Sequence, residues 1–421
     1  MTHFISRCTA VVFAVLLCAA LAPPQLRAMG DTLSLARMLA MARAQNPALA
    51  AMHARTRAAE ARIRSAEAWP EPRVSFEFFQ IPVAKPNPFT ENMEYDYSIE
   101  QMIHWPGKLR LMGEMERAGV RMAQENTAMT ALELEAAVRG AHAMLWGAER
   151  RREILAETRA LAEQIAEGVR ARYAVARASQ SDALRAQTEI EKLASDAAAI
   201  EAEVRGARAM LNALVGRDIS SPIMLTDMPD TTMSATDAAT SPTDRADLRA
   251  MRAEIEMRRT EQAAMRRELY PDFMLRGMYK QMLMGMPDYY ALMIGVTIPV
   301  APWSRGRVDG RIEEAEARAR AGEEMLADMR RMNEARVHEL RAQTEALRER
   351  SARMRDALIP QADQAFESSL ASYRSAGSDF TAVLDSYRML TMYRMDLAML
   401  TADYATALAR LRLAEGREDG R

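Results

Sequence analysis

The feature that most constrains this 421-residue chain is a run of about seventy residues, 108–178, that contains no proline and few glycines. Apolar side chains recur along it at helical spacing, as at Ile154, Leu161 and Ile165. At a rise of about 1.5 Å per residue, one helix of that length would reach roughly 100 Å. Because no ordinary globular domain needs such a helix, the sequence predicts an elongated, mainly α molecule with a small β part.

The chain also repeats itself after about 200 residues. The matching residues are Trp69-Pro70 with Tyr270-Pro271, Ile99 with Ile298, Gly107 with Gly306, Ala118 with Ala317, Tyr173 with Tyr373, and Leu184 with Leu384. A period shared by helices and strands indicates a duplicated unit. We therefore expect two copies of helix, strand, strand, long helix, helix, in residues 29–215 and 244–415. A proline-rich linker, 216–243, joins them, and a short tail, 416–421, follows.

Residues 1–28 have the pattern of a secretory signal peptide. A basic start precedes an apolar run at residues 9–22, and the small residue Ala28 marks the expected cleavage point. A membrane anchor is the alternative, but the run is too short to span a bilayer. Cys8 and Cys18 both lie here, so after cleavage at Ala28 the mature chain would contain no cysteine for disulfides or thiol chemistry. Lipidation of Cys18 is a further alternative, but Leu17 directly before it is large where lipoprotein processing requires a small residue.

Four short alternating segments interrupt the helices. We expect strands at residues 73–79, 94–101, 273–280 and 290–298. Apolar side chains on one face and polar ones, such as Glu94 and Asp96, on the other suit a strand with lipid outside and water inside. The side chains expected to face lipid are Tyr95, Tyr97, Ile99, Leu292, Ile294 and Val296.

The number of strands implies that several copies of the chain cooperate. Strands of this length can cross an outer membrane when tilted, but a barrel needs about eight of them. An open edge in lipid would leave backbone groups unpaired at a cost of several kcal/mol each. Two copies would just suffice, and three would give a wider, water-filled lumen. The long helices should continue as a tube, whose Ala-rich faces permit close packing.

Charge and motifs argue against other classes of protein. Lys plus Arg total 56 and Asp plus Glu total 58, so no net positive charge attracts nucleic acid. We find no phosphate-binding glycine loop and no nucleophile motif, so we expect no enzymatic activity and no cofactor.

Methionines gather around the third expected strand and the loop after it. Met278, Met282, Met284 and Met286 carry thioethers, which are soft ligands suited to Cu(I) or silver. The chain has 33 methionines, however, and methionine is a general filler of apolar surface. Both interpretations stay open at this point.

Taken together, the chain resembles the TolC family of outer membrane efflux proteins over nearly its whole length after residue 28. The motifs that carry the resemblance are Leu33-Ser34-Leu35, Asn46-Pro47-Ala48-Leu49, the Trp69-Pro70 and Tyr270-Pro271 stops, Ile298-Pro299, Arg305-Gly306-Arg307, and two turns, Arg172-Tyr173 to Asp182-Ala183-Leu184 and Ser372-Tyr373 to Val383-Leu384-Asp385. The methionines further resemble the heavy-metal branch of that family.

The resemblance implies a homotrimer. Its outer membrane β-barrel would be continued by a periplasmic α-helical coiled-coil barrel that is closed at the tip. A periplasmic adaptor and an inner-membrane pump, expected to be of the resistance-nodulation-division type, would open it.

In the family, acidic residues after the second turn narrow the tunnel entrance. Asp385 matches one such position; Ala382 stands where an acidic partner would be, and Asp379 is near enough to substitute. A ring of carboxylates would hold cations, although Asp in an exposed turn can also simply cap the next helix. The other residues expected at the tip are Asp182, Tyr173, Tyr373 and Gly377.

The function expected from this resemblance is a passive outer membrane exit duct of a tripartite efflux system in the Gram-negative envelope. Its cargo would be heavy-metal ions, of the copper and silver or zinc and cobalt type, or small toxic molecules. A type I protein or peptide secretion channel is an alternative with the same architecture. A periplasmic coiled-coil adaptor is a second alternative, but it would need no lipid-facing strands.

Overall fold

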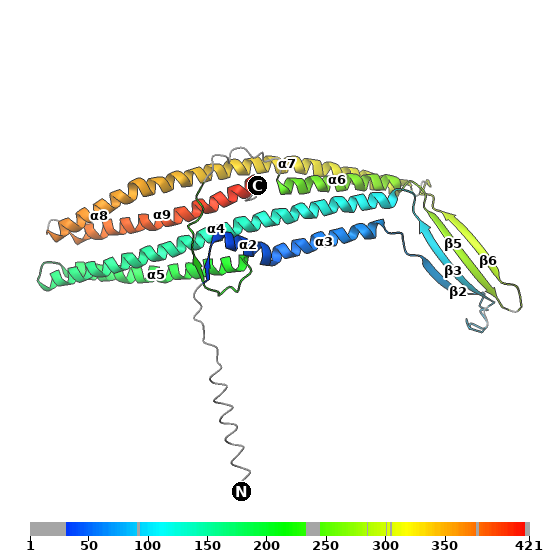
Figure 1. Cartoon of the computed structure of the whole chain (residues 1–421), viewed down its shortest axis with the longest axis horizontal. Helices are drawn as coiled ribbons and strands as arrows, with labels where there is room; N and C mark the ends of the chain where they lie inside the picture. The colour runs from blue at the N-terminus through cyan, green and yellow to red at the C-terminus, as the bar shows by residue number, and fades with distance from the viewer. Residues whose placement is uncertain are drawn as a thin grey trace, which may run out of the picture.

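Long helices run side by side along the molecule, and a small sheet continues from one end of them (Figure 1). The computed structural model describes residues 31–90, 93–232, 245–283, 285–299, 301–303, 305–375 and 379–416. The expected signal peptide, residues 1–28, lies outside the described residues.

Both copies of the predicted unit are present in the expected order. The first contains α2 (Leu35–Gln45), α3 (Pro47–Glu67), β2 (Arg73–Phe79), β3 (Glu94–Ile103), α4 (Lys108–Ala174) and α5 (Gln180–Leu214). The second contains α6 (Ala246–Arg267), β5 (Phe273–Met282), β6 (Tyr289–Val296), α7 (Arg305–Arg353), η3 (Met354–Leu358), α8 (Ile359–Arg374) and α9 (Phe380–Glu415). The two-repeat architecture predicted from the sequence is confirmed.

The long helix α4 organises the helical layer. Its 67 residues make it about 100 Å long. It packs against α3 and α6 towards the sheet, and against α5 and α9 in the other half. Small residues bring the helices close: a Cβ added at Gly147 of α4 would lie 2.8 Å from Ala402 Cβ of α9. The expected role of small side chains in close packing is thus visible at this contact.

The second long helix departs from the prediction near its end. The proline-free pattern predicts one helix to about residue 359, but α7 ends at Arg353 and a single wide π-helical turn, η3, follows. Pro360 lies in the first turn of α8. Because proline lacks the N–H for a helical hydrogen bond and its ring crowds the carbonyl four residues earlier, the chain widens just before it.

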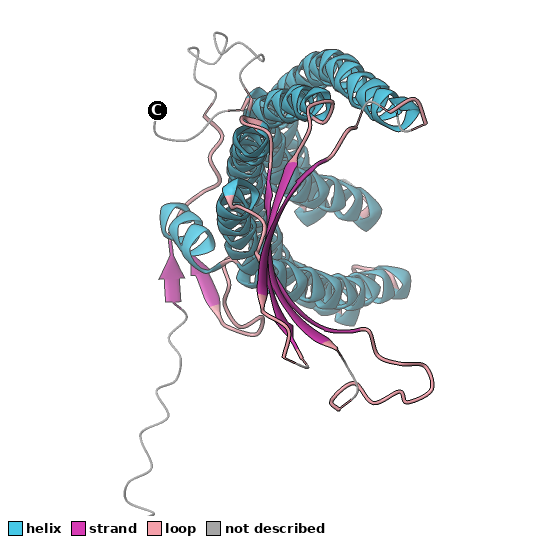
Figure 2. Ribbon diagram, turned by 90° about the vertical axis from the view of Figure 1, so that its right-hand side faces the viewer, coloured by secondary structure: helices cyan, strands magenta, loops and turns pink. Residues whose placement is uncertain are grey.

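A small second sheet lies outside the helical layer. β1 (Asp31–Leu33) pairs in parallel with β4 (Ile223–Leu225), so part of the segment expected as a linker is a strand. This pair and α2 lie on the convex side of the bowed layer of helices (Figure 2). The described part of the linker that forms β4 therefore lies on the outside of the layer of helices.

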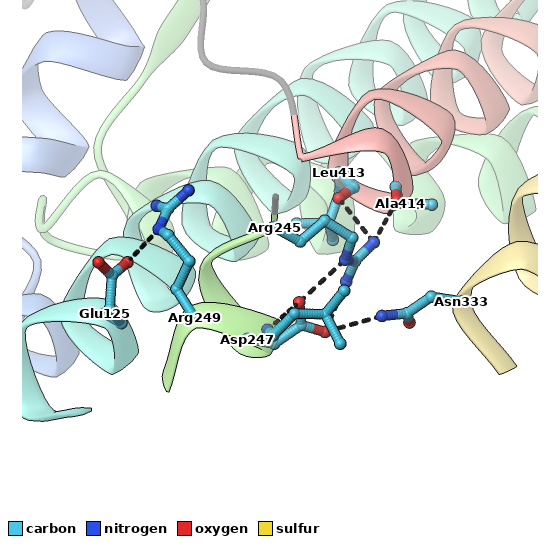
Figure 3. Close-up of polar contacts among 8 residues, drawn as sticks. Glu125, Arg245, Asp247, Arg249, Asn333, Leu413 and Ala414 are labelled. Carbon is cyan, nitrogen blue, oxygen red and sulfur yellow. Dashed lines mark hydrogen bonds and ion pairs between the residues drawn. The ribbon is translucent and has the colours of Figure 1, made fainter. Parts of the chain in front are cut away.

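In each repeat, an equivalent polar contact joins the residue before a helix, α3 or α6, to the end of the last helix, α5 or α9. The Asn46 side chain donates to the carbonyl of Leu214 at 2.9 Å, and the Arg245 side chain donates to the carbonyl of Leu413 at 3.2 Å. Both the donors and the acceptors are 199 positions apart. Arg245 also pairs with Asp247, at 3.0 Å from Nε to Oδ1, and Asp247 accepts a hydrogen bond from Asn333 (Figure 3).

Candidate functional site: a two-faced sheet and a helical tip

The four main strands form one antiparallel sheet in the order β2-β3-β5-β6. The register pairs Ile99 of β3 with Gly277 of β5, and Gly277 with Leu292 of β6. Since side chains at paired positions share a face and alternate along each strand, this register fixes both faces of the sheet. The sheet joins the two repeats through the central β3–β5 pair.

One face is apolar and exposed. The register places Tyr95, Tyr97, Ile99, Leu292, Ile294 and Val296 on it together. Leu292 is 70% exposed and Ile294 is 68% exposed. That this face contacts lipid stays a prediction, but the grouping that it requires is present.

Aromatic rings cross the apolar face as one row. The ring centroids are 4.9 Å apart between Phe76 and Tyr97, 6.0 Å between Tyr97 and Tyr279, and 5.2 Å between Tyr279 and Tyr290. The row therefore links all four strands. Such pairs add roughly 0.5–1.5 kcal/mol each beyond burial, so they fix the strand register as well as the chemistry of the surface.

The opposite face carries cross-strand ion pairs. Lys280 Nζ lies 2.5 Å from Glu94 Oε1 and 3.0 Å from Asp96 Oδ2, and Arg276 Nε lies 2.8 Å from Glu100 Oε2. Glu94 is only 6% exposed, although it is charged and lies on a sheet surface. Side chains converge on the concave side of a curved sheet and diverge on the convex side. The polar face is therefore the concave one, and it bows in the same direction as the layer of helices (Figure 2).

Both edges of the sheet are open among the described residues. β2 pairs only with β3, and β6 pairs only with β5. The outward backbone groups of these two strands are thus available to further strands. The described helices include none that is long and apolar enough to cross a membrane.

At the end of the helices far from the sheet, α4 and α5 form one helical hairpin and α8 and α9 form another, and one arginine connects the two. Arg172, at the end of α4, donates to the carbonyl of Tyr373 in α8 at 2.7 Å. Its guanidinium also lies 4.5 Å from the centre of the Tyr373 ring. Burial, as the largest influence, raises the pKa of Tyr373. The expected tip residue Tyr373 is therefore held by the other hairpin, whereas Tyr173 is exposed.

The hairpins are also joined further along. The Glu189 carboxylate in α5 is almost fully buried and accepts a hydrogen bond from Arg388 Nε of α9 at 2.9 Å. Arg172 belongs to one of the tip motifs in the sequence, but nothing there predicts its contact with Tyr373, and Glu189 and Arg388 belong to no motif. In the sequence each of these three looks like an ordinary charged residue on a helix.

The predicted aspartates have different surroundings. Asp182 accepts a hydrogen bond from Ser179 N at 3.1 Å and completes a capping box at the start of α5. Asp379 is the N-cap residue of α9 and accepts from Thr381 Oγ1 at 3.2 Å. Asp385 is exposed on α9. Gly377 lies outside the described residues. The Asp182 carboxylate is thus engaged in capping α5, and the Asp379 carboxylate accepts a hydrogen bond from Thr381. The exposed Asp385 carboxylate is the best placed of the three to face an opening.

The described methionine candidates lie in a strand and in the turn after it, and their metal binding stays untested. Met278 and Met282 lie in β5 on the polar face, and Met286 lies exposed in the turn towards β6. Met284 falls outside the described residues. In the part of the chain that the structure describes, no group of three or more His, Cys, Asp or Glu side chains could hold a metal ion.

The chain matches the model of a known family. The outer membrane efflux protein model covers residues 38–217 and 243–417. No curated protein sequence matches the chain significantly.

Several solved structures share the fold over most of their length. The outer membrane protein VceC from Vibrio cholerae aligns with a TM-score of 0.75 at 18% identity, over 91% of this chain and 96% of that one. CusC aligns with a TM-score of 0.76 at 17% identity, over 92% and 93%. The open state of the MtrE outer membrane channel from Neisseria gonorrhoeae aligns with a TM-score of 0.73 at 17% identity, over 91% and 88%. At these identities the likeness concerns the fold.

Proposed function

The chain belongs to the outer membrane efflux protein family, and from this premise we propose that it is the exit duct of a tripartite system that exports heavy-metal ions or small toxic molecules. It is an outer membrane channel with a periplasmic extension, and it conducts rather than catalyses. The observation that carries the proposal is a two-faced sheet, open at both edges, attached to helices about 100 Å long.

Three copies complete the duct. Each contributes four strands, so three give twelve, an even number within the range of bacterial barrels. β6 of one copy would pair with β2 of the next, which satisfies the open backbone groups in lipid. The apolar face then meets lipid and the ion-paired face lines the lumen. Two copies would give a barrel of eight strands, and side chains would fill the lumen of so narrow a barrel.

The layer of helices supports the same closure. In the half nearest the sheet the outermost helices are α3 and α7, and in the other half they are α5 and α8. Neighbouring copies would cover these sides and make a tube below the barrel. A periplasmic adaptor and an inner-membrane pump of the resistance-nodulation-division type would engage the tip, since the duct has no energy source of its own. The genes beside this one would identify the pump.

Asp385 forms the selective ring at the tip in this proposal. Three copies of an exposed carboxylate around a narrow opening attract cations and repel anions. Replacing Asp385 with Ala should reduce the cation preference of single pores in planar bilayers at least about twofold, because the ring supplies the local charge. Asp403→Ala is the matched control, because it removes a carboxylate from the same helix 18 residues further from the tip. Equal ion selectivity in the Asp385 variant and the wild type would show that Asp385 does not form a selective ring.

Deletion of the gene tests the export role itself. Cells without the duct should become sensitive to, or accumulate, whatever the partner pump exports. Growth would be compared with that of the complemented strain on copper, silver, zinc, cobalt and common antibiotics. A deletion strain that matches wild type for every compound and every exported protein would contradict an export role.

A further inference from the structure

The methionines of the main sheet are divided unevenly between its two faces. In the four described strands, all of them lie on the concave, polar face: Met102, Met274, Met278, Met282 and Met293. The register establishes this, because it pairs Met278 with Ser98, Met282 with Glu94, and Met293 with Arg276. No methionine of these strands shares the face of Ile99 and Leu292.

This division is the opposite of what apolar filling predicts. A convex face in contact with lipid needs apolar side chains, and here it is built mainly from Val, Ile, Leu, Phe and Tyr, together with Gly277, Gln101 and Gln281. Methionine would suit that face at least as well as it suits a polar one. Because methionine is confined to the side that carries Glu94, Asp96 and Glu100, a property other than hydrophobicity must explain its position. The thioether sulfur, a soft ligand, is that property.

Three of the methionines lie on the polar face near the end of the sheet closest to the helices. Met102 of β3 is paired directly with Met274 of β5, a position where Cβ atoms lie about 4.5–5.5 Å apart. The Met274 side chain extends over β6, because a Cβ added at Gly295 would lie 2.9 Å from Met274 Cε. Met293 lies two residues before Gly295 on the same face, about 7 Å along the strand.

The charges on this face favour a soft ion over a hard one. The carboxylates of Glu94, Asp96 and Glu100 already contact Lys280 or Arg276. The described part of the chain offers no set of three His, Cys or carboxylate ligands that could hold a divalent ion. The sulfur atoms, in contrast, have no need of a protein partner. Monovalent Cu⁺ and Ag⁺ prefer such ligands.

We propose that Met102, Met274 and Met293 form a binding site for a soft monovalent cation, Cu⁺ or Ag⁺, on the lumen wall. This site rests on the function proposed above, since the concave face lines a lumen only in the closed duct. It narrows the cargo to one chemical class. Three copies would place three such sites at one level of the barrel, where an ion leaving the helical tube would meet them first.

Silver is the probe, because Ag⁺ needs no reductant to stay monovalent. The purified protein in detergent would be dialysed against silver nitrate in chloride-free buffer, and bound silver measured by mass spectrometry. We expect the triple variant M102L/M274L/M293L to bind Ag⁺ at least about tenfold more weakly than wild type, since it loses all three ligands. The control M325L/M332L/M399L, which replaces three exposed methionines on the helices, should bind as wild type does.

Three results would overturn the site: wild type that does not bind Ag⁺, a lumen variant that binds it as wild type does, or a control that loses as much. Because leucine keeps the apolar volume, both variants should form pores of wild-type conductance in silver-free bilayers. Wild-type pores without silver binding would refute this site and leave the duct intact. Absence of pores would refute the duct itself.

Discussion

His142 is a buried titratable residue near the centre of the long helix α4. It is 1% exposed, and its Nε2 has no hydrogen-bond partner among the described residues. Burial is the largest influence on its pKa and lowers it; Asp227 raises it and Arg139 lowers it further. The imidazole is therefore held neutral, packed as an apolar side chain, and a proton added to it would be a buried charge.

Acid should therefore destabilise the protein through His142. Below the ordinary pKa of about 6.5 the unfolded chain takes up a proton that the folded chain resists, so the free energy of unfolding falls as pH falls. The loss is at most about 1.4 kcal/mol per pH unit. Melting temperatures measured from about pH 7.5 to about pH 5.5 should fall less in His142→Leu than in wild type.

The control replaces the exposed His53 with Leu, which should leave the acid-dependent loss unchanged. An equal loss in His142→Leu and in wild type would show that His142 is not the group that responds to acid.

At the scale of elements, alternation and helical runs were enough to predict the strands, their apolar faces and the long helix. Tyr95, Tyr97 and Ile99 share a face for purely local reasons. The β3–β5 pairing that joins the repeats could not be predicted, because no turn fixes the register of strands whose paired residues are 170 to 188 positions apart. The π-helical turn before Pro360 could not be predicted, because the sequence marks the proline but not whether the chain widens or ends there.

The tip site was predicted only in part, for a similar reason. Tyr373 and the aspartates lie in turns whose sequences mark them. The partner of Tyr373, Arg172, lies 201 residues earlier in another hairpin, and no local pattern shows that the two hairpin ends meet. Asp182 could be read equally well as a tip residue or as a cap, and the capping box in the structure accounts for it.

The contact between the two hairpins should restrain the tip. Arg172→Ala removes a charged hydrogen bond to the Tyr373 carbonyl and the contact with its ring, worth roughly 1.5–3 kcal/mol for the bond. We expect larger or more frequent openings of single pores in planar bilayers. Arg170→Ala is the matched control, since Arg170 contacts Gln187 within one hairpin. Identical conductance in both variants would show that the Arg172 contact does not hold the tip closed.

At the scale of the whole molecule, the sheet and the layer of helices are both incomplete in a single copy of the chain. The sheet has two open edges and one face of exposed apolar side chains, and the layer of helices is an open arc (Figure 2). Ion pairs connect the strands on the concave face, and small residues let the helices pack closely. In the proposed duct, association of copies buries the edges, surrounds a lumen and places Asp385 around a common axis.

The mass of the intact assembly tests this most directly. Native mass spectrometry of the purified mature protein, released from detergent micelles, should give a single species of three chains. A monomer that remains in solution after the detergent is removed would contradict the account, because a chain that needs no partners cannot be one third of a closed duct.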